Sequence, residues 1–213
     1  MSSDGITARR RGAGRGLAFI VSGPSGAGKN SVINRVMKLE PNLAFSVSYT
    51  TRSRRRREAE GIDYHYVSRD EFARLLDAGE LVEHVTYHED LYGTGRSQID
   101  RVVAAGKDVI LNVDVEGAKR LQAIGLPPYT VSYIFLVPSS LHRLEERLRA
   151  RGSESPQHIA DRLRIAEREM DSLGDFDYLV INDDFDTAVA ELRAIVISER
   201  LRILADPSKE TRD

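Results

Sequence analysis

The chain alternates between short, nearly unbroken apolar runs and segments in which apolar residues recur every three or four positions. Runs of strand length occupy residues 17–21, 109–113, 130–137 and 178–182. Strands that are apolar on both faces are typical of a parallel sheet covered by helices, so these runs predict central strands. Their alternation with helical segments predicts an α/β fold with right-handed crossovers.

Helical periodicity is clearest in the second half of the chain. Apolar residues spaced by three and four predict helices over residues 159–173 and 141–148, the latter after a Pro-Ser-Ser start signal. A last helix is predicted to begin near Asp186.

Residues 45–94 break the alternation. They contain strand-like pieces at 45–48 and 64–67, a run of arginines, and a small helical pattern at 71–77. We therefore expect this segment to fold as an inserted unit beside the main sheet.

Composition narrows the class of protein. The 213 residues are 41% apolar, and 31 Lys and Arg stand against 33 Asp and Glu, a net charge of −2 that excludes a generally basic nucleic-acid coat. The absence of cysteine excludes a disulfide scaffold, a thiolate metal site and a cysteine nucleophile. No apolar run has the 18 or more residues of a membrane span. A soluble cytoplasmic protein is expected, with a disordered basic tail at residues 1–15.

A glycine-rich loop follows the first predicted strand and opens a helix. The loop Gly-Pro-Ser-Gly-Ala-Gly-Lys over residues 23–29 matches the GxxxxGK motif, whose main-chain N–H groups surround phosphate oxygens while the lysine adds a positive charge. The flanking strand and helix favour this interpretation over a turn of no chemical meaning. The candidate residues for binding a nucleoside triphosphate are Gly23, Ser25, Gly26, Ala27, Gly28, Lys29, Asn30 and Ser31.

The position after the lysine departs from the motif. A serine or threonine there would hold Mg²⁺, but the chain has Asn30. Ser31 is the nearest hydroxyl and the candidate metal ligand, and the side-chain carbonyl of Asn30 is the alternative.

Five arginines occur among the six residues 52–57. A charge run is usually a solvated face, and a nucleic-acid patch would contain interleaved aromatic residues. The remaining interpretation is a compact anion site, because two or three guanidinium groups suffice to bind one phosphate.

These motifs together resemble the guanylate kinases. The resemblance rests on the phosphate loop and on four further stretches, in order: Ser46–Arg52, Gly61–Val67, Tyr92–Thr94 and Asn112–Gly117. It covers roughly residues 15–204. It implies an ATP-binding P-loop core (16–44, 95–138 and 171–207), a GMP-binding insertion (45–94) and a lid (139–170). The implied reaction is ATP + GMP = ADP + GDP.

The resemblance also implies residue roles in the GMP site. Arg52 and Arg55 would bind the GMP phosphate with the hydroxyls of Tyr64 and Tyr92, although a neighbouring arginine could substitute for Arg55. The carboxylate of Glu83 would accept from guanine N1–H and the 2-amino group. Adenine would leave that carboxylate unpaired, and such sites reject analogues by about 10⁴-fold or more. The other implied contacts are Ser48 and Thr94 to guanine O6, and Asp114 near the GMP site and the water shell of the metal.

Three arginines in the lid correspond to catalytic positions of the family. Arg147, Arg151 and Arg162 would act with Lys29 on the transferred phosphoryl group, where cations and positioning supply most of the catalysis. Asn182 would lie near the adenine. No general base is required, because the GMP phosphate is already an anionic nucleophile. The remaining lid arginines, Arg149, Arg164 and Arg168, are interpreted as surface ion-pair partners.

Two other functions remain open alternatives at this point. One is a non-catalytic guanylate-kinase-like binding module, and the other is a related kinase that acts on a phosphorylated sugar. The expected partners are ATP and GMP, with neither nucleic acid nor a membrane. The chain is either a monomer or a homo-oligomer.

Overall fold

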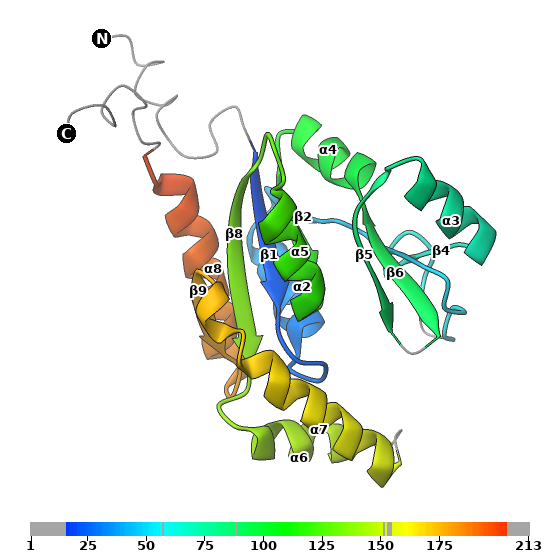
Figure 1. Cartoon of the computed structure of the whole chain (residues 1–213). Helices are drawn as coiled ribbons and strands as arrows, with labels where there is room; N and C mark the ends of the chain where they lie inside the picture. Colours follow the sequence, from blue (N-terminus) through cyan, green and yellow to red (C-terminus); the bar gives the residue numbers. More distant parts are fainter. Residues whose placement is uncertain (1–15, 57, 88, 151, 153–154, 204–213) are drawn as a thin grey trace, which may run out of the picture.

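The structure is a computed structural model that describes residues 16–203 except 57, 88, 151, 153 and 154. Its larger sheet has the strand order β2-β7-β1-β8-β9, and every neighbouring pair is parallel. The bounds are β1 Leu17–Ser22, β2 Leu43–Phe45, β7 Asp108–Asn112, β8 Thr130–Val137 and β9 Tyr178–Ile181. Helices flank this sheet (Figure 1), so the predicted α/β fold class is confirmed.

Alternate residues of β1 enter two apolar clusters on opposite faces of the sheet. Phe19 and Val21 pack in the cluster formed with α2 (Lys29–Leu39) and α8 (Phe185–Leu201). Ile20 packs in the cluster formed with α4 (Arg96–Ala104) and α5 (Val115–Ile124). Burial on both faces explains why the strands are apolar throughout rather than alternating.

A smaller sheet lies beside the larger one (Figure 1) and has the order β4-β3-β6-β5. Its strands are β3 Tyr49–Thr50, β4 His65–Tyr66, β5 Leu81–Tyr87 and β6 Asp90–Gly95, with α3 at Arg69–Asp77. Strand β6 is antiparallel to both β5 and β3, whereas β3 and β4 are parallel. The aromatic side chain of Phe72 on α3 is buried.

Two helices project beyond one end of the larger sheet (Figure 1), namely α6 (Leu141–Ala150) and α7 (Pro156–Met170). They share a small apolar cluster that includes Leu144, Leu148 and Ile159. Ser155 caps the amino terminus of α7 by accepting from the His158 N–H at 3.3 Å. The short 3₁₀ helix Leu173–Asp175 follows.

One strand prediction was wrong. Residues 45–48 were expected to form a strand of the inserted unit, but the strand is Leu43–Phe45, and it pairs with β7 in the larger sheet. A three-residue strand is too short for an apolar pattern to mark its ends, and its place depends on a partner more than 60 residues away. The last helix begins at Phe185, next to the predicted start, after an Asp184 cap.

The predicted tail, residues 1–15, lies outside the described residues. The proposed division into core, insertion and lid stays a prediction. Within the described part of the chain, no helix combines the length and apolar character that crossing a membrane requires.

Candidate active site

The glycine-rich loop lies where β1 passes into α2. Gly23 has a φ of +129°, and a β-carbon there would stand 2.2 Å from the Leu136 carbonyl oxygen, so the loop crosses directly against β8. Helix α2 begins at Lys29 after Gly28, and no side chain caps it within the described residues. Its first N–H groups are therefore available to an anion, which the helix dipole also favours.

Lys29 is folded back over this loop. Its Nζ donates to the carbonyl oxygens of Gly23 and Pro24 at 2.5 and 3.2 Å. Burial lowers the pKa of this ammonium to about 8, although the nearby carboxylates of Glu169 and Asp114 act in the opposite direction. The lysine is thus desolvated at the end of the loop, where it can contact a phosphate.

Two arginines from the projecting helices contact the same loop. Arg147 on α6 donates through Nη1 to the Ala27 carbonyl oxygen at 3.1 Å and through Nη2 to the carbonyl oxygen of Asn182. Arg162 on α7 donates to Ser25 Oγ at 2.8 Å. The Asn182 side chain donates to the Ala27 carbonyl oxygen at 2.7 Å. These contacts bring residues from three distant segments to one phosphate-binding loop.

An open cavity of about 330 Å³ lies beside the loop. Its lining includes Gly26, Gly28, Ser31, Arg147, Asn182 and Phe185. Most of these residues were candidates for ATP binding. Phe185 was not among them, and it contributes a half-exposed aromatic ring.

The residue after the lysine has a partner on β7. Asn112, at the end of that strand, donates its side-chain N–H to Asn30 Oδ1. Ser31 is exposed on the first turn of α2. No group of three or more His, Asp or Glu side chains in the described part of the chain has the geometry of a metal site.

A second group of polar residues lies on the smaller sheet. Glu83 on β5 faces Thr94 on β6, and the Thr94 hydroxyl donates to Glu83 Oε1 at 2.6 Å. Both side chains are buried, with Glu83 8% exposed. Tyr49 pairs with Gly93 in the antiparallel ladder, so Ser48 and Thr94 each stand next to a residue of this pair.

Burial raises the pKa of the Glu83 carboxyl to about 7, and the nearby charge of Asp114 acts in the same direction while the Thr94 hydrogen bond opposes it. Asp114 itself caps α5 by accepting from the Gly117 N–H at 2.6 Å. Burial raises its pKa too. Two carboxyl groups therefore meet at the first turn of α5, Glu83 from the smaller sheet and Asp114 from the cap of the helix itself.

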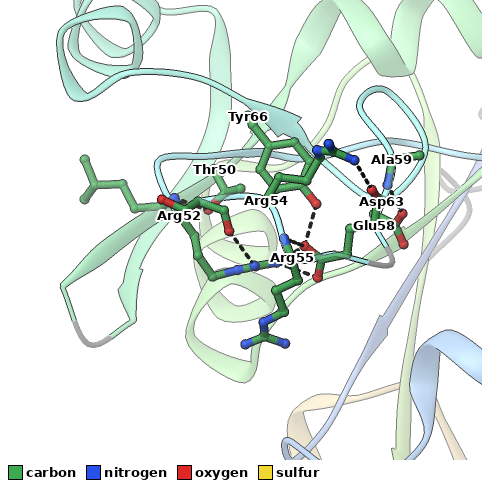
Figure 2. A network of polar contacts seen from close by, with 10 residues as sticks. Thr50, Arg52, Arg54, Arg55, Glu58, Ala59, Asp63 and Tyr66 are labelled. Carbon is green, nitrogen blue, oxygen red and sulfur yellow. Dashed lines mark hydrogen bonds and ion pairs between the residues drawn. The ribbon is translucent and has the colours of Figure 1, made fainter.

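Arg52 forms the centre of a third group (Figure 2). Its guanidinium carbon lies 5.5 Å from the ring centroid of Tyr64 and 5.9 Å from that of Tyr66. Its Nη2 lies 2.8 and 2.9 Å from the two carboxylate oxygens of Glu58. The ring of Tyr92 lies 5.7 Å from that of Tyr64. Arg52, Tyr64 and Tyr92 are thus brought together.

The Arg55 side chain lies differently. Its guanidinium points away from the Glu58 carboxylate (Figure 2), although its positive charge still acts on the Tyr64 hydroxyl. Only its main-chain N–H joins the group, donating to Glu58 Oε2 at 2.9 Å. Arg54 donates instead to the Glu58 carbonyl oxygen at 2.6 Å.

Comparison with known proteins finds relatives that match most of this chain. A family model described as guanylate kinase matches residues 15–199. The guanylate kinase of Xanthomonas axonopodis pv. citri (strain 306) is 42% identical over 188 residues, which cover 88% of this chain and 91% of the relative. That of Yersinia pestis bv. Antiqua (strain Antiqua) is 41% identical over 191 residues, 89% and 91% of the two chains.

A solved structure extends the likeness to three dimensions. The crystal structure of guanylate kinase from Anaplasma phagocytophilum matches with a TM-score of 0.71 at 30% identity, over 88% of this chain and 87% of that one. The chain belongs to the guanylate kinase family. Membership makes it a nucleoside monophosphate kinase, and the alternative of a non-catalytic module is not favoured.

Within this guanylate kinase fold, most candidate residues lie in one of two regions, because the second and third groups both lie at the smaller sheet. The first surrounds the phosphate loop and includes Lys29, Arg147, Arg162 and Asn182. The second spans Arg52 to Thr94 on the smaller sheet. Arg151 lies outside the described residues. The surface role expected of Arg149 and Arg164 agrees with their ion pairs to Glu145 and Asp161.

Three charged residues near the site of this guanylate kinase belong to none of its sequence motifs. Glu169 lies seven residues after Arg162 on α7, a spacing that places both on one helix face. Its charge acts on Lys29, and burial raises its own pKa to about 6. Arg120 on α5 acts on the carboxyls of Glu83 and Asp114. The third, Glu58, is the carboxylate at the end of the arginine run.

Proposed function

We propose that this protein transfers the γ-phosphoryl group of ATP to GMP and releases ADP and GDP. The observation that carries the proposal is the buried Glu83 carboxylate beside Thr94, on the same small sheet as the Arg52 cluster. The Glu83 carboxylate can accept from the two adjacent donors of guanine, and the cationic Arg52 cluster can bind the phosphate of the same nucleotide. The phosphate loop on the larger sheet supplies the second nucleotide site.

In this proposal, Glu83 and its neighbours bind the guanine base. The ionised Glu83 carboxylate accepts from N1–H and the 2-amino group, and Ser48 and Thr94 donate to O6. Adenine has an acceptor at ring N1 and no 2-amino group, so it would leave a buried carboxylate unpaired. The GMP phosphate is bound by Arg52 and Arg55 with the hydroxyls of Tyr64 and Tyr92.

The transfer step is assigned to cations that converge on the phosphate loop. Lys29, Arg147, Arg151 and Arg162 neutralise the charge that spreads over the transferred phosphoryl oxygens. Arg147 and Arg162 already contact the loop, at Ala27 and Ser25. The nucleophile is the GMP phosphate oxygen, which needs no proton removed. The loop N–H groups from Gly23 to Asn30 bind the ATP phosphates, and Asn182 borders the adenine.

Mg²⁺ is the proposed metal. The possible metal ligands near the loop are oxygen atoms of Ser31, Asn30, Asn112 and Asp114, and oxygen ligands suit a hard cation. Mg²⁺ commonly takes few protein ligands besides substrate phosphates. Ser31 is the proposed ligand and Asp114 a partner of the metal-bound water. When bound, the metal supplies charge neutralisation on the ATP phosphates.

The three segments of the chain take separate roles in this proposal. The core (16–44, 95–138 and 171–207) binds ATP, the insertion (45–94) binds GMP, and the lid (139–170) closes over both. Closure of the lid excludes water and limits ATP hydrolysis.

The test is a comparison of acceptors. ADP formation is measured with Mg²⁺-ATP and each of GMP, AMP, CMP and UMP, in the wild type and in Glu83→Gln. We expect a strong preference for GMP in the wild type. We also expect GMP kcat/KM to fall by about 100-fold or more in the variant, with KM for ATP nearly unchanged. Equal use of the four acceptors by the wild type would contradict the assignment.

A further inference from the structure

Glu58 has more polar contacts than any role so far assigned to it explains (Figure 2). Its two carboxylate oxygens accept from Arg52 Nη2 at 2.8 and 2.9 Å. Oε2 also accepts from the Arg55 main-chain N–H at 2.9 Å and from the Tyr66 hydroxyl at 2.8 Å. One carboxylate therefore joins a guanidinium, a loop amide and a phenol.

The Glu58 and Arg52 side chains are largely withdrawn from solvent, with exposed fractions of 17% and 13%. Burial alone would raise the pKa of the Glu58 carboxyl, but the hydrogen bonds from Arg52, the Arg55 N–H and Tyr66 outweigh it and lower that pKa to about 2. Glu58 is therefore ionised throughout the neutral range. An ion pair this shielded is screened less by solvent than an exposed one.

The pair fixes the orientation of Arg52. The Tyr64 and Tyr66 rings lie near its guanidinium, Nη1 donates to the Ser53 carbonyl oxygen at 2.9 Å, and Glu58 holds Nη2. An arginine side chain loses rotamer entropy when it is ordered, so ordering it before the ligand arrives favours binding. Tyr92, which is also proposed to bind the phosphate, interacts with the same guanidinium.

The loop that carries the arginines closes around the same carboxylate. Arg54 donates to the Glu58 carbonyl oxygen at 2.6 Å, and Glu58 N donates to the Arg55 carbonyl oxygen at 3.0 Å. Together with the Arg55 N–H bond, these contacts turn the chain so that Arg54, Arg55 and Arg56 are exposed around an ordered Arg52. Their positive charge offsets the negative charge that Glu58 brings near the phosphate.

We propose that Glu58 is a positioning residue of the GMP phosphate site, which holds the Arg52 guanidinium in its binding orientation without contacting the phosphate itself. This inference rests on the proposed function, which places the GMP phosphate at Arg52. Glu58, at the end of the arginine run, would thus order the phosphate site before GMP binds. Loss of the carboxylate charge leaves Arg52 free to leave that orientation.

The first test is Glu58→Gln, which keeps the shape of the side chain and removes its charge. We expect KM for GMP to rise about tenfold, the usual effect of losing a charged hydrogen bond, while kcat and KM for ATP change by less than about twofold. Glu60→Gln is the matched control, because Glu60 lies two residues away and pairs with His65 rather than with Arg52. Its kinetic constants should equal those of the wild type.

The second test asks whether Glu58 acts through Arg52. In an Arg52→Ala background, which itself weakens GMP binding, Glu58→Gln should no longer raise KM for GMP, because the group that it positions is gone. An equal rise in both backgrounds would overturn the proposal, since Glu58 would then act on the fold. An unchanged or lowered KM for GMP in the single variant would overturn it as well.

The outcomes separate this inference from the proposed function. A wild type that forms no GDP from GMP refutes the function. A wild type that forms GDP while Glu58→Gln behaves identically refutes only the role of Glu58. If thermal melting shows that Glu58→Gln is unfolded at the assay temperature, Glu58→Asp takes its place. It keeps the charge on a shorter arm, and an unchanged KM for GMP in that folded variant would equally refute the role.

Discussion

Glu83 Oε2 lies so close to Gly117 that a β-carbon on residue 117 would stand 2.9 Å from that oxygen. The same β-carbon would stand 2.9 Å from Asp114 Oδ1, the atom that caps α5. Glycine inside a helix is about 1 kcal/mol less favourable than alanine, so helix stability does not explain its presence here. The close approach of Glu83 does explain the glycine, because its carboxylate occupies the space that a side chain at residue 117 of α5 would need.

Gly117→Ala should therefore impair GMP use selectively. The added methyl group would displace the Glu83 carboxylate, and we expect kcat/KM for GMP to fall by about tenfold or more while KM for ATP stays within about twofold. Gly174→Ala is the matched control, because a β-carbon there would meet nothing within 4 Å. Steady-state kinetics of both variants measure the effect, and equal behaviour of the two would contradict it.

The pKa of about 7 at Glu83 predicts a pH dependence of GMP binding. Below that pKa the carboxyl is protonated and can no longer accept from both guanine donors. We expect kcat/KM for GMP to fall about tenfold per pH unit on the acid side of the Glu83 pKa. The corresponding profile for Glu83→Gln should lose this limb, and a flat wild-type profile between pH 5.5 and 8 would refute the prediction.

The unliganded protein offers an independent check on Glu83. Its folded-state pKa is raised from 4.5, so the folded state retains a proton that the unfolded state loses as the pH rises towards 7. Stability from this group therefore declines over that interval, and the cost is fully present above it. Denaturant melts should show Glu83→Gln more stable than the wild type at pH 8, and the two nearly equal near pH 4.

Arg162 is expected to act on the transferred phosphoryl group rather than on the fold. Arg162→Ala removes a cation that contacts Ser25 of the phosphate loop, so we expect kcat to fall by about 100-fold or more. Arg164→Ala serves as the control, since Arg164 pairs at the surface with Asp161. The measurement is kcat of both variants at saturating ATP and GMP. A kcat of Arg162→Ala within about threefold of the wild type would refute its role in phosphoryl transfer.

A charge network far from the loop should govern stability. Arg200 donates to Asp108 Oδ2 and Glu40 Oε2, each at 2.6 Å, and these two carboxylates are only 16% and 11% exposed. Arg200→Ala leaves both without this partner, and the free energy of unfolding should drop by about 2–4 kcal/mol. Arg193→Ala should cost less than about 1 kcal/mol, because Arg193 is 45% exposed. Equal losses in the two variants would contradict this difference.

The sequence predicts well those elements of the fold that are determined by neighbouring residues in the chain. Four core strands and the phosphate loop follow from unbroken apolar runs and from glycine spacing, because burial on both faces and a tight turn each constrain neighbouring residues directly. The helices α6 and α7, which were expected from apolar residues spaced by three and four, show the same local logic. The guanylate kinase family could be named because its motifs are short, ordered segments of this kind.

Other features depend on how distant elements pack. Asn30 and Asn112 are 82 residues apart, and nothing in either segment indicates that their side chains bond. Among the described strands, β2 pairs with β7 alone, so its place in the larger sheet could not be read from its own three residues. Such contacts form only when the elements pack together, so neither of the two segments in contact carries a sequence pattern that would predict them.

Glu58 and Gly117 show the same division at single residues. The arginine run indicated an anion site, but which carboxylate would order Arg52 depended on the turn that brings residue 58 back to it. Likewise, the glycine of the Asp114–Gly117 turn acquires its purpose only when Glu83 arrives from another sheet. Composition and pattern set which groups are present and which strands form, whereas the close approach of groups from separate elements sets their charge states and their chemistry.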